Sequence, residues 1–274
     1  MAYYQKLTGA TTANQFLIDL AAFVAANGWT VDLDTIYNTS YRRLHFHQGN
    51  AHFDLYSNGT LAMTMHGCTG FNGGLAPNLQ PGATPAKGYQ VIAGSDCWLI
   101  SVTGGLYICV LNNVAPFYWY HWCCFFIIQD KVGSWTDGFG LSAGSAAELF
   151  GSGWYGSPAL GQLYLNGAWS ATVVAGGISG NKLAGHLPTK APNHYNGGLA
   201  PMPVLLMQGL ATDSSKRVPL GYAPGLYQTN GGDIYQAGDE LVIGADTYLL
   251  TPGSTSAATT GVVNQVDFLF KLGA

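Results

Sequence analysis

The sequence predicts an α+β fold in which β-structure dominates: an N-terminal amphipathic helix, then antiparallel β-meanders forming a sandwich-like body with long Gly-rich loops. Three observations predict this class. One segment near the start has apolar residues at helical spacing. Most later segments alternate apolar and polar residues with a period of two. The 274 residues also include 38 glycines, which gather between these segments.

The helix is expected over residues 12–27. In TANQFLIDLAAFVAANGW the apolar residues recur every three or four positions, which gives one apolar stripe. Thr12 and Gln15 have the three-residue offset of a capping box. Asn27-Gly28 then supplies the left-handed stop that helix C-termini favour.

Strands are expected after the helix, where the period changes from that of a helix to that of a strand. The segment 28–36 alternates, and residues 43–67 predict a three-strand meander. Its turns are expected at 48–50 and 57–59, because Asn and Gly residues there accept positive φ.

A second hairpin is expected over residues 97–113, turning at Gly104-Gly105. The next segment, YWYHWCCFFIIQ at 118–129, is apolar at consecutive positions. A strand that is apolar on both faces is typically buried on both faces, so we expect it in the centre of a sheet.

The later part of the chain has two characters. Residues 133–198 are rich in Gly, Ser, Ala and Trp, and we expect loops and short strands shaped to lie against a neighbouring molecule. Residues 233–252 predict a strand–turn–strand with bends at 238–239 and 244–245. Residues 262–272 predict a closing strand or short helix.

The chain therefore divides into three regions that we expect to form one compact unit. They are an N-terminal helix and β-meander region (1–132), a Gly/Trp-rich region of loops and short strands (133–200) and a C-terminal β region (201–274). This length gives ample core to one large domain or to two ordinary ones.

Charged residues make up only 9% of the chain, against about 25% in ordinary soluble domains. The surface must therefore consist largely of Ser, Thr, Asn, Gly and aromatic residues, which suits burial against other subunits. The net charge is −4, and the ten Lys and Arg residues form no basic run. We therefore expect no specific binding to nucleic acid.

Membrane and secretion signals are not expected either. The longest apolar run, residues 114–128, is shorter than the roughly 20 residues of a membrane helix and contains Pro116 and His121. The first ten residues lack the basic and apolar regions of a signal peptide.

The five cysteines have no C-x-x-C spacing, so we expect reduced thiols packed as small apolar groups. A structural zinc site built on them is the alternative, which the missing paired spacing disfavours. They are Cys68, Cys97, Cys109, Cys123 and Cys124.

The frame aromatic-Asn-Gly-Gly-Leu-Ala-Pro occurs twice, at 71–77 and 195–201. Asn-Gly-Gly tolerates positive φ, and Ala-Pro favours an extended exit. Either one turn sequence has arisen twice, or two matched loops meet neighbouring subunits at the rim of an assembly. The second interpretation makes six residues interface candidates: Asn72, Gly73, Gly74, Asn196, Gly197 and Gly198.

Aromatic residues of the Gly-rich region are further interface candidates, namely Trp135, Trp154 and Tyr155. Trp135, Trp154 and Trp169 are all expected to be exposed. Aromatic side chains on a surface with little charge commonly anchor protein interfaces. The alternative is that they stack on sugars, which would make the chain a receptor- or glycan-binding protein.

Four residues of the meander are candidate metal ligands. His45 and His47 lie two apart on one strand, and His52 and Asp54 lie two apart on the next, so in register all four share a face. Imidazole and carboxylate suit zinc or iron. The alternative is a polar outer face opposite a phenylalanine-lined inner face, which the alternation predicts without metal. A metal-binding enzyme at this cluster is the second functional alternative.

Other catalytic signals are missing from the sequence. It has no P-loop, dinucleotide fingerprint, EF-hand loop or nucleophile elbow. Its two glutamates, Glu148 and Glu240, have no catalytic spacing. We therefore expect no enzyme activity, no catalytic residues and no cofactor.

Several motifs, taken in order, resemble a group of tailed-phage virion proteins. NQFLIDLAAFVAANGWTVD is similar to their short helix ending in Asn-Gly-Trp-Thr, and SNGT, GCTGFNGG and QPGA follow it. FYWYHWCCFFIIQDKVGSWTDGFG resembles their aromatic strand with a central His, and GDELVIGADTYLLTP resembles their closing strand pair. The resemblance covers most of the chain, although Cys123-Cys124 and the repeated loop depart from the pattern.

This resemblance implies a non-enzymatic structural protein of the tail, baseplate or neck of a long-tailed phage. Such a protein would be assembled in the host cytoplasm and located in the virion. Its partners would be copies of itself, in a trimeric or hexameric ring, and other tail, baseplate or neck proteins. Subunits of a closed ring repeat one head-to-tail interface.

Overall fold

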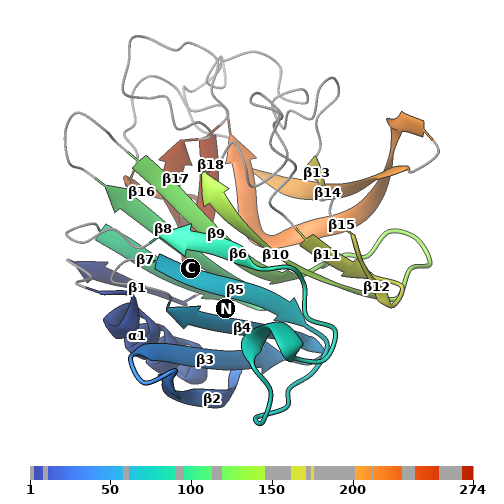
Figure 1. Ribbon diagram of the computed structural model, residues 1–274. Helices are drawn as coiled ribbons and strands as arrows, with labels where there is room; N and C mark the ends of the chain where they lie inside the picture. Colours follow the sequence, from blue (N-terminus) through green and yellow to red (C-terminus); the bar gives the residue numbers. More distant parts are fainter. Residues whose placement is uncertain are drawn as a thin grey trace, which may run out of the picture.

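The computed structural model describes eleven segments of the chain: residues 3–8, 12–57, 62–90, 96–112, 119–145, 162–170, 174–175, 201–210, 213–229, 238–252 and 267–273. One α-helix and three antiparallel sheets account for most of them (Figure 1). The predicted α+β class with dominant β-structure is therefore confirmed.

The helix, α1 (Ala13–Ala26), has the predicted position and both predicted ends. The Thr12 hydroxyl accepts a hydrogen bond from the Gln15 backbone N–H at 3.1 Å. The Gln15 side chain donates to Asp19, so only half of the capping box forms. At the other end Gly28 has φ +83°, and the Trp29 N–H bonds the Val24 carbonyl, which is a Schellman motif.

Each sheet is antiparallel throughout. In spatial order, the five-stranded sheet has β2 (Thr30–Tyr37), β3 (Tyr41–Gln48), β4 (Ala51–Ser57), β5 (Ala62–Cys68) and β6 (Lys87–Gln90). The seven-stranded sheet has β1 (Tyr3–Thr8), β7 (Asp96–Val102), β8 (Gly105–Asn112), β9 (Trp119–Ile127), β10 (Asp137–Ser145), β11 (Gln162–Leu165) and β12 (Ala168–Ser170). The six-stranded sheet has β13 (Val174–Ala175), β14 (Met202–Leu210), β15 (Asp213–Thr229), β18 (Asp267–Gly273), β17 (Asp246–Pro252) and β16 (Glu240–Ile243).

The three sheets form layers with the seven-stranded sheet in the middle (Figure 1). Its neighbouring residues alternate between two cores: Cys123 and Phe125 of β9 pack with α1 and the five-stranded sheet, whereas Cys124 and Phe126 pack with the six-stranded sheet. β9 is the fourth of the seven strands, so the predicted central strand is confirmed. The layering also explains the double cysteine, because each thiol faces a different core.

All five cysteines are buried free thiols, as predicted. Burial raises the pKa of every one of them, which keeps the thiols protonated. Cys97, Cys109, Cys123 and Cys124 therefore act as small apolar groups within the cores, whereas Cys68 of β5, which pairs with His52, is buried outside them.

Two strand predictions need correction. The hairpin of β7 and β8 turns at Thr103-Gly104, one residue earlier than predicted, because Gly104 has φ +78° and Gly105 already pairs with Val102. Residues 137–145, expected among loops and short strands, form the nine-residue strand β10. Its glycines allow close packing: a Cβ on Gly140 would lie 2.5 Å from the Gln162 carbonyl oxygen of β11.

The closing predictions agree with the structure over residues 238–252 and 267–273, and the rest of both predicted segments lies outside the described residues. β16 and β17 form the predicted hairpin around Gly244, which has φ +67°. The final segment is the strand β18 and not a helix. No helix in the described part of the chain has the length and apolar character needed to cross a bilayer.

Candidate metal centre

The predicted histidine-rich face of the meander exists. β3 and β4 pair His45 with Asp54 and His47 with His52, and they pair Phe46 with Phe53 between these two pairs. Both phenylalanines lie in the core beneath the sheet. The four predicted residues therefore share the opposite face, as the alternation requires.

A residue of the neighbouring edge strand joins them. The pairing of β2 with β3 shifts between Val31 and Leu33, so that Asp32 is the additional residue of a β-bulge opposite His45. Bulges re-aim side chains, and this one brings the Asp32 carboxylate to the histidines. Asp32 was not among the predicted ligands. The alternation of residues 28–36 placed it on a strand, but a bulge leaves no clear signal in the sequence.

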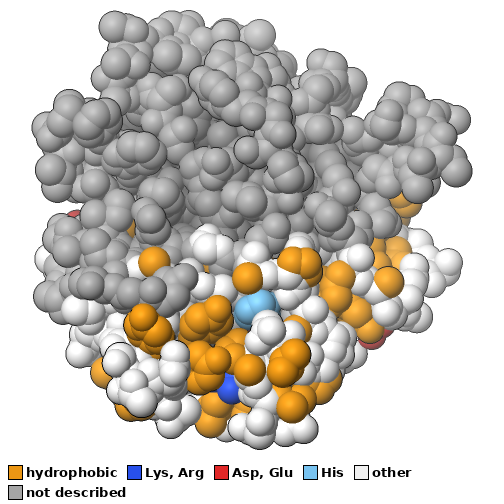
Figure 2. All heavy atoms as spheres, viewed as in Figure 1, with side chains coloured by type: hydrophobic (Ala, Val, Ile, Leu, Met, Phe, Trp, Pro, Cys, Tyr) orange, Lys and Arg blue, Asp and Glu red, His pale blue; other side chains and the backbone are white. Residues whose placement is uncertain are grey.

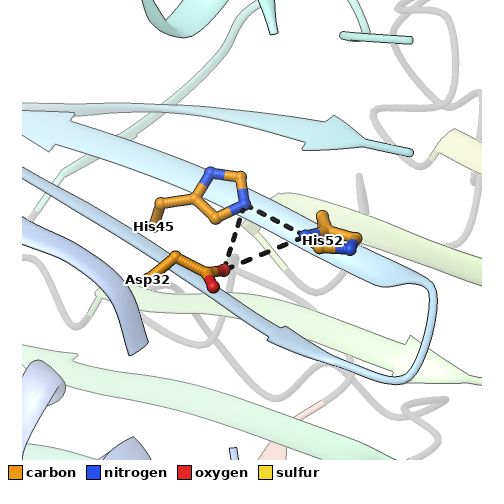
Figure 3. Close-up of side chains that lie close together, drawn as sticks. All are labelled: Asp32, His45 and His52. Carbon is orange, nitrogen blue, oxygen red and sulfur yellow. Dashed lines mark hydrogen bonds and ion pairs between the residues drawn. The ribbon is translucent and has the colours of Figure 1, made fainter. Parts of the chain in front are cut away.

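Asp32, His45 and His52 form the one group of three potential metal ligands found among the described residues (Figure 3). His45 Nε2 lies 3.2 Å from His52 Nδ1 and 3.7 Å from Asp32 Oδ2, and His52 Nδ1 lies 4.0 Å from the same oxygen. The three side chains come from three adjacent strands and point toward a common centre.

The other two predicted ligands lie around this centre. The Asp54 carboxylate accepts from His45 Nδ1 at 3.0 Å and from the Arg43 guanidinium, whose Nε and Nη2 lie 3.0 and 2.6 Å from its two oxygens. The His47 imidazole stacks on His52 with centroids 4.5 Å apart, and its Nδ1 lies 2.7 Å from Asp32 Oδ2. Both thus hold a member of the central group in place.

These contacts orient the rings. A carboxylate only accepts, so His45 Nδ1 donates its proton to Asp54, and Nε2 is the His45 nitrogen that faces the centre. Burial, followed by the neighbouring His47 and His45, lowers the pKa of His52 to about 4. Asp32 opposes this shift but does not cancel it. His52 is therefore neutral near pH 7 and has a ring lone pair.

The first copy of the repeated loop covers part of this polar face. The Phe71 ring lies 4.5 Å from the His45 ring, and the Leu75 carbonyl accepts from Arg43 Nη1 at 2.8 Å. The buried Gln80 amide holds the loop by donating to the carbonyls of Asn72 and Leu75. The loop is therefore held against this face by a ring contact and hydrogen bonds, and it is not only a turn.

The loop forms without the positive φ that its Asn-Gly-Gly sequence predicts. Neither Gly73 nor Gly74 has a positive φ. The Asn72 side chain instead accepts from the Gly74 N–H, and the Asn72 carbonyl accepts from the Leu75 N–H. Asn72, Gly73 and Gly74 are exposed, as an interface would need.

The second copy of the loop, with Asn196, Gly197 and Gly198, lies outside the described residues, as do Trp154 and Tyr155. Trp135 and Trp169 lie inside them, and the expectation that they are exposed is wrong. Trp135 is 8% exposed and packs over Gly138, where a Cβ would meet the indole ring. Trp169 is half-buried and meets Phe139 edge-to-face.

Sequence comparison gives no independent guide to this site. No protein-family model matches the chain, and no curated protein matches it with significance.

Proposed function

We propose that the chain is a non-enzymatic structural component of a phage virion, built into a ring in the tail, baseplate or neck through contacts between subunits. The low charge and the ordered resemblance to virion proteins support this role. The structural observation that supports it most strongly is the exposure of hydrophobic side chains on edge strands of the three sheets.

Each of the three sheets ends in an edge strand with an exposed large hydrophobic side chain. β1 presents Tyr3 and Tyr4, β2 presents Ile36 at 58% exposure, and β16 presents Val242 at 75% exposure. Edge strands of monomers are commonly protected by charge, Pro or bulges, because open edges pair with other chains. β2 has such a bulge at Asp32, but Ile36 lies beyond the bulge, and the exposed apolar side chains of the three edges favour contact with further subunits.

The visible surface agrees with that role. On the face drawn in Figure 2, hydrophobic side chains are spread over the described part and very few charged side chains interrupt them. A surface with little charge packs against copies of itself without like-charge repulsion. This feature supports self-association, and the resemblance supplies the virion setting.

Light scattering across a concentration series tests the proposal. We expect the wild-type chain to form a discrete oligomer, most simply a trimer or hexamer. Ile36→Lys combined with Val242→Lys should shift the mass to the monomer, because each lysine places a charge in the proposed contact. Ile18→Lys on α1 is the matched control, since Ile18 is also exposed but lies on no sheet edge.

A wild-type chain that stays monomeric at every concentration would contradict edge-mediated assembly. So would a double variant that keeps its oligomeric mass. Circular dichroism of each variant shows whether the fold is retained, so that loss of assembly is distinguished from unfolding.

A further inference from the structure

We propose that Asp32, His45 and His52 bind one divalent transition-metal ion, with zinc as the ion that fits best. This site is independent of the proposed virion role, which requires no metal. The proposal rests on three observations: the spacing of the donor atoms, the way each ligand is held, and the access of solvent to the centre.

The donor spacing matches a zinc ion. The distances of 3.2, 3.7 and 4.0 Å define a triangle between His45 Nε2, His52 Nδ1 and Asp32 Oδ2. A point about 2.1 Å from all three atoms exists inside such a triangle, and zinc–nitrogen and zinc–oxygen bonds have about this length. A slight contraction of the triangle would raise the ion out of its plane into the tetrahedral geometry that zinc prefers.

Each ligand is held by a residue behind it. Asp54 accepts the Nδ1 proton of His45, which aims the opposite nitrogen at the centre, and Arg43 fixes Asp54 in turn. His47 binds the Asp32 carboxylate and stacks on the His52 ring. Carboxylate–histidine–metal arrangements of this kind orient ligands and raise their basicity.

The chemistry of the donors selects the class of ion. Two imidazole nitrogens and one carboxylate oxygen suit zinc or ferrous iron, whereas calcium and magnesium require oxygen ligands. When zinc binds His52 through Nδ1, the ring proton resides on Nε2. Three protein ligands leave a coordination position for water.

The centre is reachable from solvent. The His45 side chain is fully buried, but those of His52 and Asp32 are 15% and 19% exposed. An ion can therefore enter from the partly exposed side of His52 and Asp32 and reach the buried His45 ring. Once bound, it would tie the edge strand β2 to β3 and β4 through one ligand from each strand.

Calorimetric titration of chelator-treated wild-type protein with zinc chloride is the decisive experiment. We expect one zinc ion per chain with a Kd of about 1 μM or below. Zinc at about 100 times Kd should raise Tm by about 5 °C, because the ion binds only the folded state. Cobalt(II) at the same site should give the visible absorption of a four- or five-coordinate ion.

Two variants locate the site. Asp32→Asn and His52→Gln should each weaken zinc binding by at least about 100-fold, since each removes a direct ligand. Asp34→Asn is the matched control: Asp34 lies on the same strand and undergoes the same chemical change, but it pairs with Arg42. It should keep the wild-type zinc affinity.

Nitrogen NMR of the histidine rings tests the geometry in the wild-type protein, whatever the stability of the variants. Zinc should shift Nε2 of His45 and Nδ1 of His52. The proposal is overturned if the wild type binds no zinc at about 100 μM. It is also overturned if zinc leaves the ring nitrogens of His45 and His52 unshifted, or if folded Asp32→Asn and His52→Gln proteins bind zinc as the wild type does.

Discussion

At the residue scale, adjacent arginines of β3 have opposite surroundings. Arg43 and Asp54 form an ion pair whose side chains are 4% and 0% exposed, and the Leu75 carbonyl accepts a further hydrogen bond from Arg43. Arg42 pairs with Asp34, and those side chains are 18% and 28% exposed. The sequence Tyr-Arg-Arg-Leu-His alternates in and out of the sheet, so one arginine lies beneath the loop and the other lies near solvent.

Arg43→Gln should lower the free energy of unfolding by about 3–5 kcal/mol, because it leaves the Asp54 carboxylate buried without its cation. Arg42→Gln should cost less than about 1 kcal/mol, since its ion pair is partly solvated. Urea denaturation of both variants measures the difference. Equal losses would show that the Asp54 carboxylate does not depend on Arg43.

The histidine pattern at this scale was predictable only in part. His45 and His47 are two positions apart on β3, as His52 and Asp54 are on β4, and this spacing was enough to place all four on one face. Which of them face a common point depends on the bulge at Asp32, and no residue preference in the sequence marks that bulge.

At the element scale, glycine has two roles that composition does not separate. Gly140 lies inside β10, where a Cβ would come within 2.5 Å of the Gln162 carbonyl oxygen and 2.9 Å of the Phe126 ring. Gly88 lies inside β6, and nothing would approach its Cβ within 4 Å. In residues 137–145, glycine frequency therefore predicted loops where close strand packing was the cause.

Gly140→Ala should lower the free energy of unfolding by about 1–3 kcal/mol, because the backbone of β11 must move to admit the methyl group. Gly88→Ala should change it by less than about 0.5 kcal/mol, since the methyl group meets open space. Thermal denaturation of the two variants checks this. A neutral Gly140→Ala would mean that β10 and β11 are less closely packed than the structure shows.

At the scale of the whole molecule, β9 belongs to both cores at once. Phe125 is buried against α1 and the five-stranded sheet, and Phe126 is buried against the six-stranded sheet. Because β9 contributes side chains to both cores, loss of packing in one core would disturb a strand that the other core also needs. We therefore expect the described layers to unfold together.

Phe125→Leu and Phe126→Leu should each lower the free energy of unfolding by about 1–2 kcal/mol through the same transition. Ile18→Ala, at an exposed position of α1, should change it by less than about 0.5 kcal/mol. Calorimetric scanning shows whether one transition or two are present. Two transitions, each moved by only one of the phenylalanine substitutions, would contradict the expected coupling of the layers.

The sequence by itself determined the elements whose causes are local. The ends of α1, the turns at Gly49 and Gly244, the alternation of β3 and β4 and the doubly apolar β9 all depend on neighbouring residues. All agree with prediction except that the reciprocal Gln15 bond of the capping box is absent. Only the tertiary structure decided the three-layer order, the bulge at Asp32, the burial of Trp135 and the loop over His45. These features join residues far apart in the chain, and their energies come from packing and hydrogen bonds that no local pattern contains.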